Sequence, residues 1–381
     1  GKWMTAKSEH LTADFSASWD LANVTTGFPM VSCVVFGKRS ASATCLPSAT
    51  IAWNGRLARA DIPWAEAKAK ITTSPGEIVA HVAGQEVPTS PYKDEFRQGA
   101  VLAPRVTLFV TETSAGPLGP GAGRVAVTSH RSTLEKEPWK SIPSLTARVE
   151  SKYVRPVYLG ETVLPFRSVD PRKAVLPISG TEVLSESEIA RDPGLASWWE
   201  TAESVWAKNK SPQDTSRLLD RIDYHGQLTA QLPLARQRVV YTKAGNSLCA
   251  TIIRDPTAIV DTSLYWSAVP SVDEAAYLCA VLNSEALLER VKPLQTLGLF
   301  GARHFDKYVF LVPFPKFDPT DRTHTLLASL ASDAEQKAQA ADVSGARTFQ
   351  AARKIVRAVL KADGVGDAIE AAVAELIPPV L

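Results

Sequence analysis

Short apolar runs rich in β-branched residues recur along the chain, separated by turns that contain glycine and proline and by segments with helical spacing. Such runs are typical of buried strands, whereas apolar residues repeated every three or four positions indicate helices. The strand-like segments are 28–38, 48–59, 99–110, 124–128, 153–160, 237–245, 247–255 and 308–314. Strands and helices follow one another without a regular βαβ alternation, so the sequence predicts an α+β fold.

Turn residues indicate how some of these strands are paired. Gly245-Asn246 separates two strand-like segments and predicts a hairpin, and Asn54-Gly55 gives the same signal near the start of the chain. The glycine-rich segment 115–124 follows a strand, but it lacks the GxxxxGK[ST] pattern and contains two prolines that remove backbone amides. It is therefore interpreted as a hairpin loop and not as a phosphate-binding loop.

Helical spacing appears between the strands and again near the C-terminus. We expect helices at 61–71, with Asp61 as N-cap, at 197–210, and at 273–292 with a break at Asn283-Ser284. From about residue 321 the chain becomes helical. Changes in composition predict three parts, which are listed by their bounds as 1–90, 91–320 and 321–381.

Composition excludes several classes of function. The net charge is +2, so nucleic-acid binding requires basic residues gathered on one surface. The four cysteines form no CxxC pair, which predicts no zinc site and fits a cytoplasmic location. No apolar run is long enough to span a membrane, and the N-terminal residues lack a signal-peptide pattern. No GxSxG motif, paired carboxylates or nuclease-like carboxylate cluster is recognisable, so no catalytic residue and no metal ligand is predicted.

Basic residues beside aromatic residues form three clusters, around Lys152 to Arg167, around Arg238 to Asn246, and after the glycines at 298 and 301. Arginine, lysine and asparagine are the side chains that bond phosphates and the edges of guanine and adenine. Each cluster by itself can also be a solvated surface. In that alternative Arg155 and Arg167 pair with Glu161 or Asp170, and His304 packs under the glycine-bounded turn.

The segment 278–331 closely resembles the C-terminal region of large N6-adenine DNA methyltransferases. It reads LCAVLNSEALLERVKPLQTLGLFGARHFDKYVFLVPFPKFDPTDRTHTLLASLA. These enzymes include type IIG and type I single-polypeptide restriction-modification enzymes and phage-defence methylases. The shared pattern is a Leu-Asn-Ser helix junction, a Gly-x-x-Gly-x-Arg knuckle, a strand that ends in alternating prolines, and a helix that begins near a histidine. Segments 19–38, 90–110 and 224–253 are similar to the same family in the same order.

The resemblance implies that the catalytic part of such an enzyme is missing from this chain. The family's motif is Asn/Asp/Ser-Pro-Pro-Tyr/Phe, in which the polar side chain and a proline carbonyl hold the adenine amino group. Here the Pro-Pro pair lies between Ile377 and Val380, and the family's cofactor-binding glycine motif is absent. By resemblance, 1–90 is the end of a methyltransferase-like α/β sheet, 91–320 a DNA target recognition domain, and 321–381 a helical tail. S-adenosylmethionine belongs to the parent protein, and this chain is expected to hold no cofactor and to catalyse nothing.

The expected function is sequence-specific binding of double-stranded DNA beside a missing N-terminal catalytic domain of an adenine-specific restriction-modification protein. The residues expected to contact DNA are Lys243, Asn246, Arg303, His304 and Lys307, with Lys152, Arg155 and Arg167 as further candidates. A rival hypothesis makes the chain a non-enzymatic interaction scaffold that uses the helices of 321–381. The sequence predicts neither the recognised bases nor the oligomeric state, nor whether the parent cuts DNA.

Overall fold

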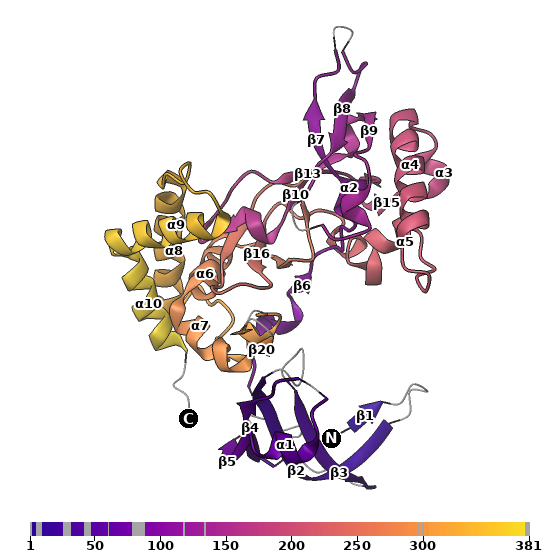
Figure 1. Ribbon diagram of the computed structural model, residues 1–381. Helices are drawn as coiled ribbons and strands as arrows, with labels where there is room; N and C mark the ends of the chain where they lie inside the picture. The colour runs from indigo at the N-terminus through magenta and orange to yellow at the C-terminus, as the bar shows by residue number, and fades with distance from the viewer. Residues whose placement is uncertain are drawn as a thin grey trace. The chain divides into compact units, whose positions relative to one another are not determined.

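The computed structural model describes residues 2–4, 10–25, 32–41, 47–59, 61–77, 88–116, 119–132, 135–295, 297–298, 301–302 and 304–377. Strands and helices are mixed along the chain, and three long helices close it, so the predicted α+β class is confirmed (Figure 1). The residues group into two compact units, Gly1–Ser90 with Glu289–Pro313 and Pro91–Leu288 with Phe314–Leu381. The predicted boundaries at 90 and 320 stay predictions.

The first unit is built on a five-stranded sheet of β1 (Lys2–Met4), β2 (His10–Thr25), β3 (Cys33–Arg39), β4 (Ala49–Arg56) and β5 (Ile71–Glu77). β2 and β4 are parallel, and the other described pairings are antiparallel. Short elements complete the unit: α1 (Trp64–Lys68), β20 (Leu297–Gly298), β21 (Gly301–Ala302) and the 3-10 turns Lys292–Leu294 and Tyr308–Leu311. Aromatic rings form a row across the sheet, from Phe36 through Trp19 and Trp53 to Trp64.

The second unit contains two main sheets. The six-stranded sheet has the order β18-β10-β13-β7-β8-β9, and the four-stranded sheet has the order β17-β16-β19-β6. The strands of the first are β7 (Phe109–Thr113), β8 (Arg124–Ser129), β9 (Thr146–Glu150), β10 (Val154–Tyr158), β13 (Arg172–Val175) and β18 (Ile259–Val260). Those of the second are β6 (Arg97–Gln98), β16 (Arg238–Thr242), β17 (Ala250–Ile253) and β19 (Leu264–Ala268). Two short pairs are β11 (Val163–Leu164) with β12 (Arg167–Ser168), and β14 (Ile178–Ser179) with β15 (Glu182–Val183).

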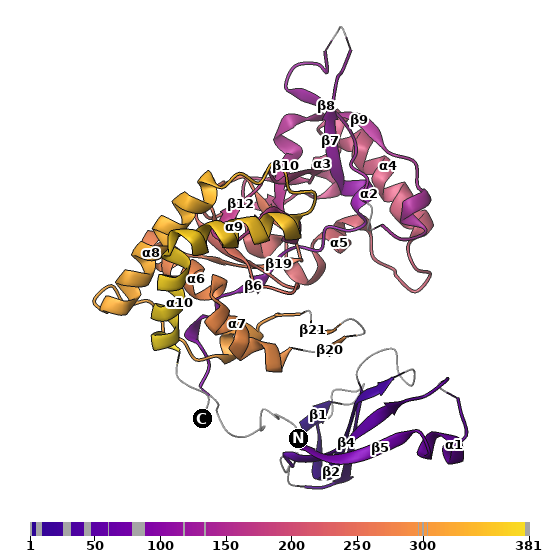
Figure 2. The ribbon, with the colours of Figure 1, turned by 60° about the vertical axis from the view of Figure 1, so that its left-hand side comes forward.

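Helices cover both sheets of the second unit. Beside the six-stranded sheet lie α2 (Arg105–Leu108), α3 (Glu186–Ile189), α4 (Pro193–Asn209) and α5 (Leu218–Ile222). α6 (Val272–Asn283) packs on β16 and β17, and α8 (Arg322–Ala340) and α10 (Val365–Leu376) pack on α6. α9 (Phe349–Asp363) packs on α8 and α10, and α7 (Glu285–Val291) follows α6 directly. Figures 1 and 2 show α8, α9 and α10 grouped with α6.

Local sequence explains why the four-stranded sheet and its helix are buried. β16 has the sequence RVVYT and every residue of it is buried, as expected for a central strand covered on both faces. In α6 the residues from Ala275 to Asn283 are all buried, and Ser271 caps the helix by accepting a hydrogen bond from the backbone amide of Glu274. The hairpin of β16 and β17, the loop between β7 and β8, and the helix break at Asn283-Ser284 are confirmed.

Four local predictions are wrong. β4 continues through Asn54-Gly55 to Arg56 and pairs there with β5, so no turn forms at that dipeptide. The segment 308–314 is not a strand, because it begins with a 3-10 turn and Pro313 near its end cannot donate to a sheet. A helical turn at Arg105–Leu108 interrupts the run 99–110. α1 begins at Trp64 after Pro63, so Asp61 is not its N-cap.

The carboxylate of Glu150 joins β9 to the start of α4. It accepts hydrogen bonds from the backbone amides of Gly194 (3.0 Å) and Leu195 (2.8 Å) and from Arg124 (2.9 Å). Burial by itself would raise the pKa of Glu150, but these hydrogen bonds outweigh burial and lower the pKa below its ordinary value. The ionised form is therefore the one that stabilises the folded unit.

We expect Glu150→Gln to lower the free energy of unfolding at pH 7 by about 1–2 kcal/mol, because hydrogen bonds to a charged acceptor are replaced by weaker ones. The pKa is lower in the folded state, so this contribution is fully present above the unfolded value of about 4.5 and disappears as the pH falls through the lower folded value. Urea unfolding at several pH values measures this contribution to the free energy of unfolding. The wild-type and Glu150→Gln curves should converge in acid, and a constant difference between them would contradict the assignment.

Candidate nucleic-acid interface

The connection between β16 and β17 carries two of the expected DNA-contacting residues, Lys243 and Asn246. The two strands pair up to Tyr241 and Ala250, and the amide of Thr242 donates to the Cys249 carbonyl at 3.0 Å. In the tip of this hairpin, which is the connection 243–249, Asn246 is exposed and Lys243 is half-buried. Gly245 has a φ of +148°, a backbone conformation that residues other than glycine rarely adopt. The sequence therefore places one basic and one amide side chain together on a short, defined turn.

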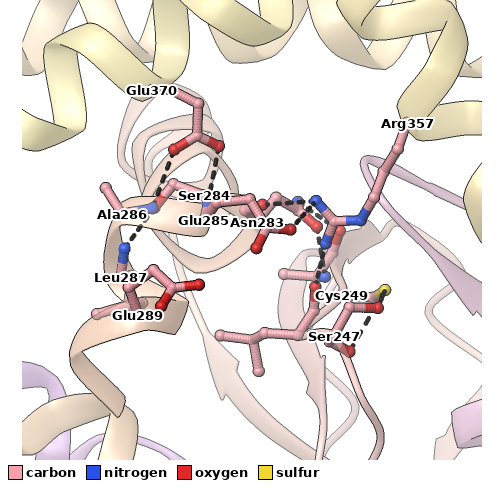
Figure 3. Close-up of polar contacts among 12 residues, drawn as sticks. Ser247, Cys249, Asn283, Ser284, Glu285, Ala286, Leu287, Glu289, Arg357 and Glu370 are labelled. Atoms are coloured by element: carbon pink, nitrogen blue, oxygen red, sulfur yellow. Dashed lines mark hydrogen bonds and ion pairs between the residues drawn. The ribbon is translucent and has the colours of Figure 1, made fainter. Parts of the chain in front are cut away.

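Asn283, the last residue of α6, fixes the start of β17 (Figure 3). Its Oδ1 accepts from the backbone amide of Ala250 at 2.9 Å, and its Nδ2 donates to the carbonyl of the same residue at 2.9 Å. Nδ2 also donates to the Cys279 carbonyl, one helical turn earlier. Asn283 therefore bonds the backbone of Ala250 as a neighbouring strand would. Because Asn283 is only 3% exposed, water could not take over these hydrogen bonds. This contact gives the Leu-Asn-Ser junction a physical role.

Arg357 of α9 holds the other side of the same connection, and Arg353, one helical turn earlier, bonds the segment 160–163. Arg357 donates to the carbonyls of Leu248 at 2.6 Å and Asn283 at 3.2 Å, and it lies 3.3 Å from a carboxylate oxygen of Glu285 (Figure 3). Arg353 donates to the carbonyls of Val163 at 3.0 Å and Gly160. Burial lowers the pKa of Arg353 from its ordinary value, and the nearby charge of Arg357 acts in the same direction. Arg353 is bonded to carbonyls and not to a carboxylate, so its positive charge is not neutralised by an ion pair in the described part of the chain.

The C-terminal helices therefore brace the hairpin. Glu370 of α10 accepts hydrogen bonds from the backbone amides of Glu285 (2.8 Å) and Ala286 (3.0 Å) at the start of α7 (Figure 3). A carboxylate at a helix N-terminus satisfies amides that have no partner inside the helix. Residues of α6, α7, α9 and α10 thus form one hydrogen-bonded group behind the tip.

The cluster from Lys152 to Arg167 is used mainly inside the fold. Arg167 donates to the carbonyls of Ala338 and Ala341, both at 2.8 Å, at the C-terminal end of α8. Arg155 donates to the Ile178 carbonyl at 3.3 Å, and burial lowers its pKa. Neither arginine pairs with Glu161, which bonds Arg172 instead. The alternative expectation of a pairing with Glu161 is therefore wrong, although a bracing role for both arginines agrees with their contacts.

Lys152 is the most accessible residue of that cluster, with its side chain 60% exposed. Its ammonium lies 3.1 Å from Asp192 and 4.8 Å from the centre of the Tyr153 ring. Hydrogen bonds with Tyr153 and Asp192 raise the pKa of Lys152. Asp192 also accepts from the Tyr153 hydroxyl, so the lysine belongs to a small network at the start of α4.

The expected DNA contacts at and just after the knuckle (298–303) are Arg303, His304 and Lys307, and they belong to the first unit. Lys243 and Asn246 belong to the second unit. Arg303 lies outside the described residues. His304 is exposed and Lys307 is half-buried, while Phe305 between them is fully buried. The alternative expectation that His304 packs under the knuckle is therefore wrong, because the side chain is exposed.

Sequence reasoning did not identify Asn283, Arg353, Arg357 or Glu370 as parts of the site. One signal was present, because Arg353 and Arg357 are spaced four residues apart beside the apolar stripe of α9, where a charged residue needs a buried partner. The described residues include no group of three or more His, Cys, Asp and Glu that could hold a metal ion. Within the same ranges, no helix is long and apolar enough to cross a membrane.

No protein-family model and no curated protein matches the sequence. Similar solved structures include the type IIL restriction-modification enzyme MmeI in complex with DNA, with 12% identity and a TM-score of 0.47. They also include the type IIG restriction endonuclease BpuSI, with 10% identity and a TM-score of 0.29. The alignments cover 96% and 91% of this chain but only 43% and 44% of those proteins, so the chain spans less than half of their length. Both TM-scores are below 0.5, so neither likeness assigns a function to this chain.

Proposed function

We propose that the second unit binds double-stranded DNA and presents the tip between β16 and β17 to it. The observation that carries the proposal is a tip with Lys243 and Asn246 that is braced from behind by Asn283 and Arg357. A rigid support is what base recognition requires, because a side chain has to be held within a fraction of an ångström of its partner. Lysine suits a phosphate, and asparagine suits the N6 and N7 edge of adenine.

Basic side chains on α9 and at the ends of α8 and α9 support an anionic partner. Arg353 and Arg167 use their described hydrogen bonds on backbone carbonyls, so their positive charges remain uncompensated by a carboxylate partner. Arg347, Lys354 and Lys361, within and just before α9, are exposed. A positive field of this kind attracts DNA and makes binding dependent on salt.

Fluorescence anisotropy with a labelled duplex, at two salt concentrations, tests this proposal. We expect Lys243→Gln to weaken binding to all duplexes alike and to reduce the slope of log affinity against log salt by about 1, since one phosphate contact is lost. Asn246→Ala is expected to reduce discrimination between duplexes by about 1–3 kcal/mol and to leave the slope unchanged. Lys208→Gln is the matched control, because Lys208 is an exposed lysine on α4. No duplex binding at low salt, or equal losses in Lys208→Gln, would refute the proposal.

We propose further that the chain is the target-recognition part of an N6-adenine DNA methyltransferase, as its resemblance implies. His304 and Lys307, with Arg303, would be the DNA contacts of the first unit, and S-adenosylmethionine would bind a catalytic domain outside this chain. The encoded sequence that precedes residue 1 tests this statement. A cofactor-binding glycine motif and a Pro-Pro-aromatic tetrad are expected there, and a preceding sequence without them would contradict the parentage.

The scaffold hypothesis is less well supported by the contacts of α8, α9 and α10. α8 and α10 pack on α6, α9 packs on α8 and α10, and side chains of α9 and α10 hold the hairpin and the start of α7. Their contacts are explained by support of the tip. We therefore assign the helical tail to the same DNA-binding function.

A further inference from the structure

A cleft of about 690 Å³ lies in the second unit where α2, the segment 135–139 and the end of α4 meet. Its lining includes Arg105, Trp139, Trp206, Lys210 and Arg221. The cleft shares no lining residue with the hairpin tip, because neither Lys243 nor Asn246 contributes to it. The duplex-binding proposal therefore leaves this cleft without a function.

The walls of the cleft are held in place by hydrogen bonds. Arg131 donates to the carbonyls of Trp139 (3.2 Å), Lys140 (2.7 Å) and Ile142 (3.0 Å), which fixes the segment that carries Trp139. At the end of α4, Trp206 and Lys210 both donate to the carbonyl of Ser216, at 2.9 and 2.7 Å. The cleft is thus formed before a ligand arrives, and little ordering is required for binding.

Two stacked tryptophans give the cleft a flat aromatic surface. The rings of Trp139 and Trp206 are 5.6 Å apart and inclined by only 10°. Trp206 is 5% exposed and packs on the core, whereas Trp139 lies above it and is half-buried. A ring that is held on one face by a second ring can stack on a planar ligand with the other face.

The charges of the cleft favour an anion. The guanidinium groups of Arg105 and Arg221 have no hydrogen bond or ion pair to any residue that the structure describes, and each lies 5.5 Å from an aromatic ring centre. The two acidic lining residues are already engaged. Glu135 accepts from the Val106 amide at 2.8 Å and lies 3.4 Å from Arg131, and Asp214 accepts from the amide and hydroxyl of Ser216.

We propose that this cleft binds a nucleoside phosphate, with the base on Trp139 and the phosphate near Arg105 and Arg221. A bare phosphate would leave the tryptophan surface unused, and an uncharged aromatic ligand would leave both arginines without a partner. Arginine and tryptophan together are the pair of side chains that bind single nucleotides outside a helix. The nucleotide can be free or can be an unpaired residue of a DNA strand.

Calorimetric titration of the full chain with deoxyadenosine monophosphate, deoxyadenosine and inorganic phosphate tests the cleft. We expect the nucleotide to bind at least about tenfold more tightly than either fragment, because it uses both surfaces. The double variant Arg105→Gln with Arg221→Gln should reduce its affinity to that of deoxyadenosine. Trp139→Leu should reduce it to that of phosphate, and Trp139→Phe should retain most of it. Arg236→Gln is the control, since Arg236 is an exposed arginine that does not line the cleft.

A duplex with one unpaired adenine, compared with the fully paired duplex, distinguishes the two sources of the nucleotide. Displacement of bound mononucleotide by the bulged duplex alone would identify a strand as the source, and displacement by neither would identify a free nucleotide. Nucleotide binding that is no tighter than phosphate binding, or that Arg236→Gln weakens as much as the double variant does, would overturn the proposal. Failure here would leave the hairpin proposal untouched, because Lys243→Gln and Asn246→Ala test that separately.

Discussion

Asn283→Ala should lower the free energy of unfolding of the second unit by about 1–3 kcal/mol, because the buried amide of Ala250 loses its partner and its carbonyl keeps only the bond from the Phe166 amide. Duplex affinity should fall as well, although Asn283 is 3% exposed and cannot itself touch DNA. The loss of affinity follows from a tip that is no longer held in one position. Urea unfolding and anisotropy titration of the same preparation measure the two effects.

Two further variants separate support from contact. Asn283→Asp keeps an acceptor for the Ala250 amide but places a buried negative charge against the carbonyl oxygens of Ala250 and Cys279, so it should be at least as damaging as alanine. Asn246→Ala removes an exposed asparagine from the same hairpin and should leave stability within about 0.5 kcal/mol of the unmodified protein. A stable Asn283→Ala protein with unchanged duplex binding would mean that the junction does not brace the tip.

Gly99→Ala is expected to have the largest effect on the fold, a loss of about 4 kcal/mol or more, because a side chain there overlaps main-chain atoms. A Cβ at this position would lie 2.4 Å from the carbonyl oxygens of both Val260 and Asp261. The adjoining backbone is fixed on both sides, since Gly99 donates to Leu264 (3.0 Å) and Ala100 donates to Val260 (2.9 Å). These bonds link β6 and β19 of one sheet to β18 of the other, so a shift at Gly99 disturbs both sheets.

Gly345→Ala is the control for this variant. A Cβ at Gly345 meets nothing within 4 Å, so the change should alter stability by no more than about 0.5 kcal/mol. Circular dichroism and urea unfolding compare the two proteins. Equal stability of Gly99→Ala and Gly345→Ala would contradict the packing of the two sheets described above.

Structural elements that depend on residues close together in the sequence were predicted well. The hairpin of β16 and β17 follows from two β-branched runs around a glycine, and α4 follows from apolar residues at helical spacing. The wrong turn at Asn54-Gly55 has a physical reason, because pairing of β4 with β5 across these residues outweighs the turn preference of the dipeptide. The segment 308–314 failed as a strand because its first four residues form a 3-10 turn and Pro313 has no amide to donate to a sheet.

Contacts between distant residues could not be predicted from the sequence. Asn283 and Ala250 are 33 residues apart, and Arg167 bonds the end of α8 171 residues later. The local sequence around a basic residue does not distinguish a side chain exposed to solvent from an arginine that bonds the carbonyls at the end of a helix. Among the expected DNA contacts, Arg155 and Arg167 bond backbone carbonyls inside the fold, whereas Asn246 is exposed on the tip. Asn246 is therefore the better candidate for a DNA contact.

Photo-crosslinking from position 246 tests the central claim most directly. A photoreactive amino acid replaces Asn246 in one preparation and Lys208 in another, and each protein is irradiated with a labelled pool of duplex DNA. The account predicts covalent adducts from position 246 that saturate with duplex concentration and decline with salt, and few from position 208. Duplex binding with adducts from position 246 no more frequent than from position 208 would contradict the claim that the hairpin tip meets DNA.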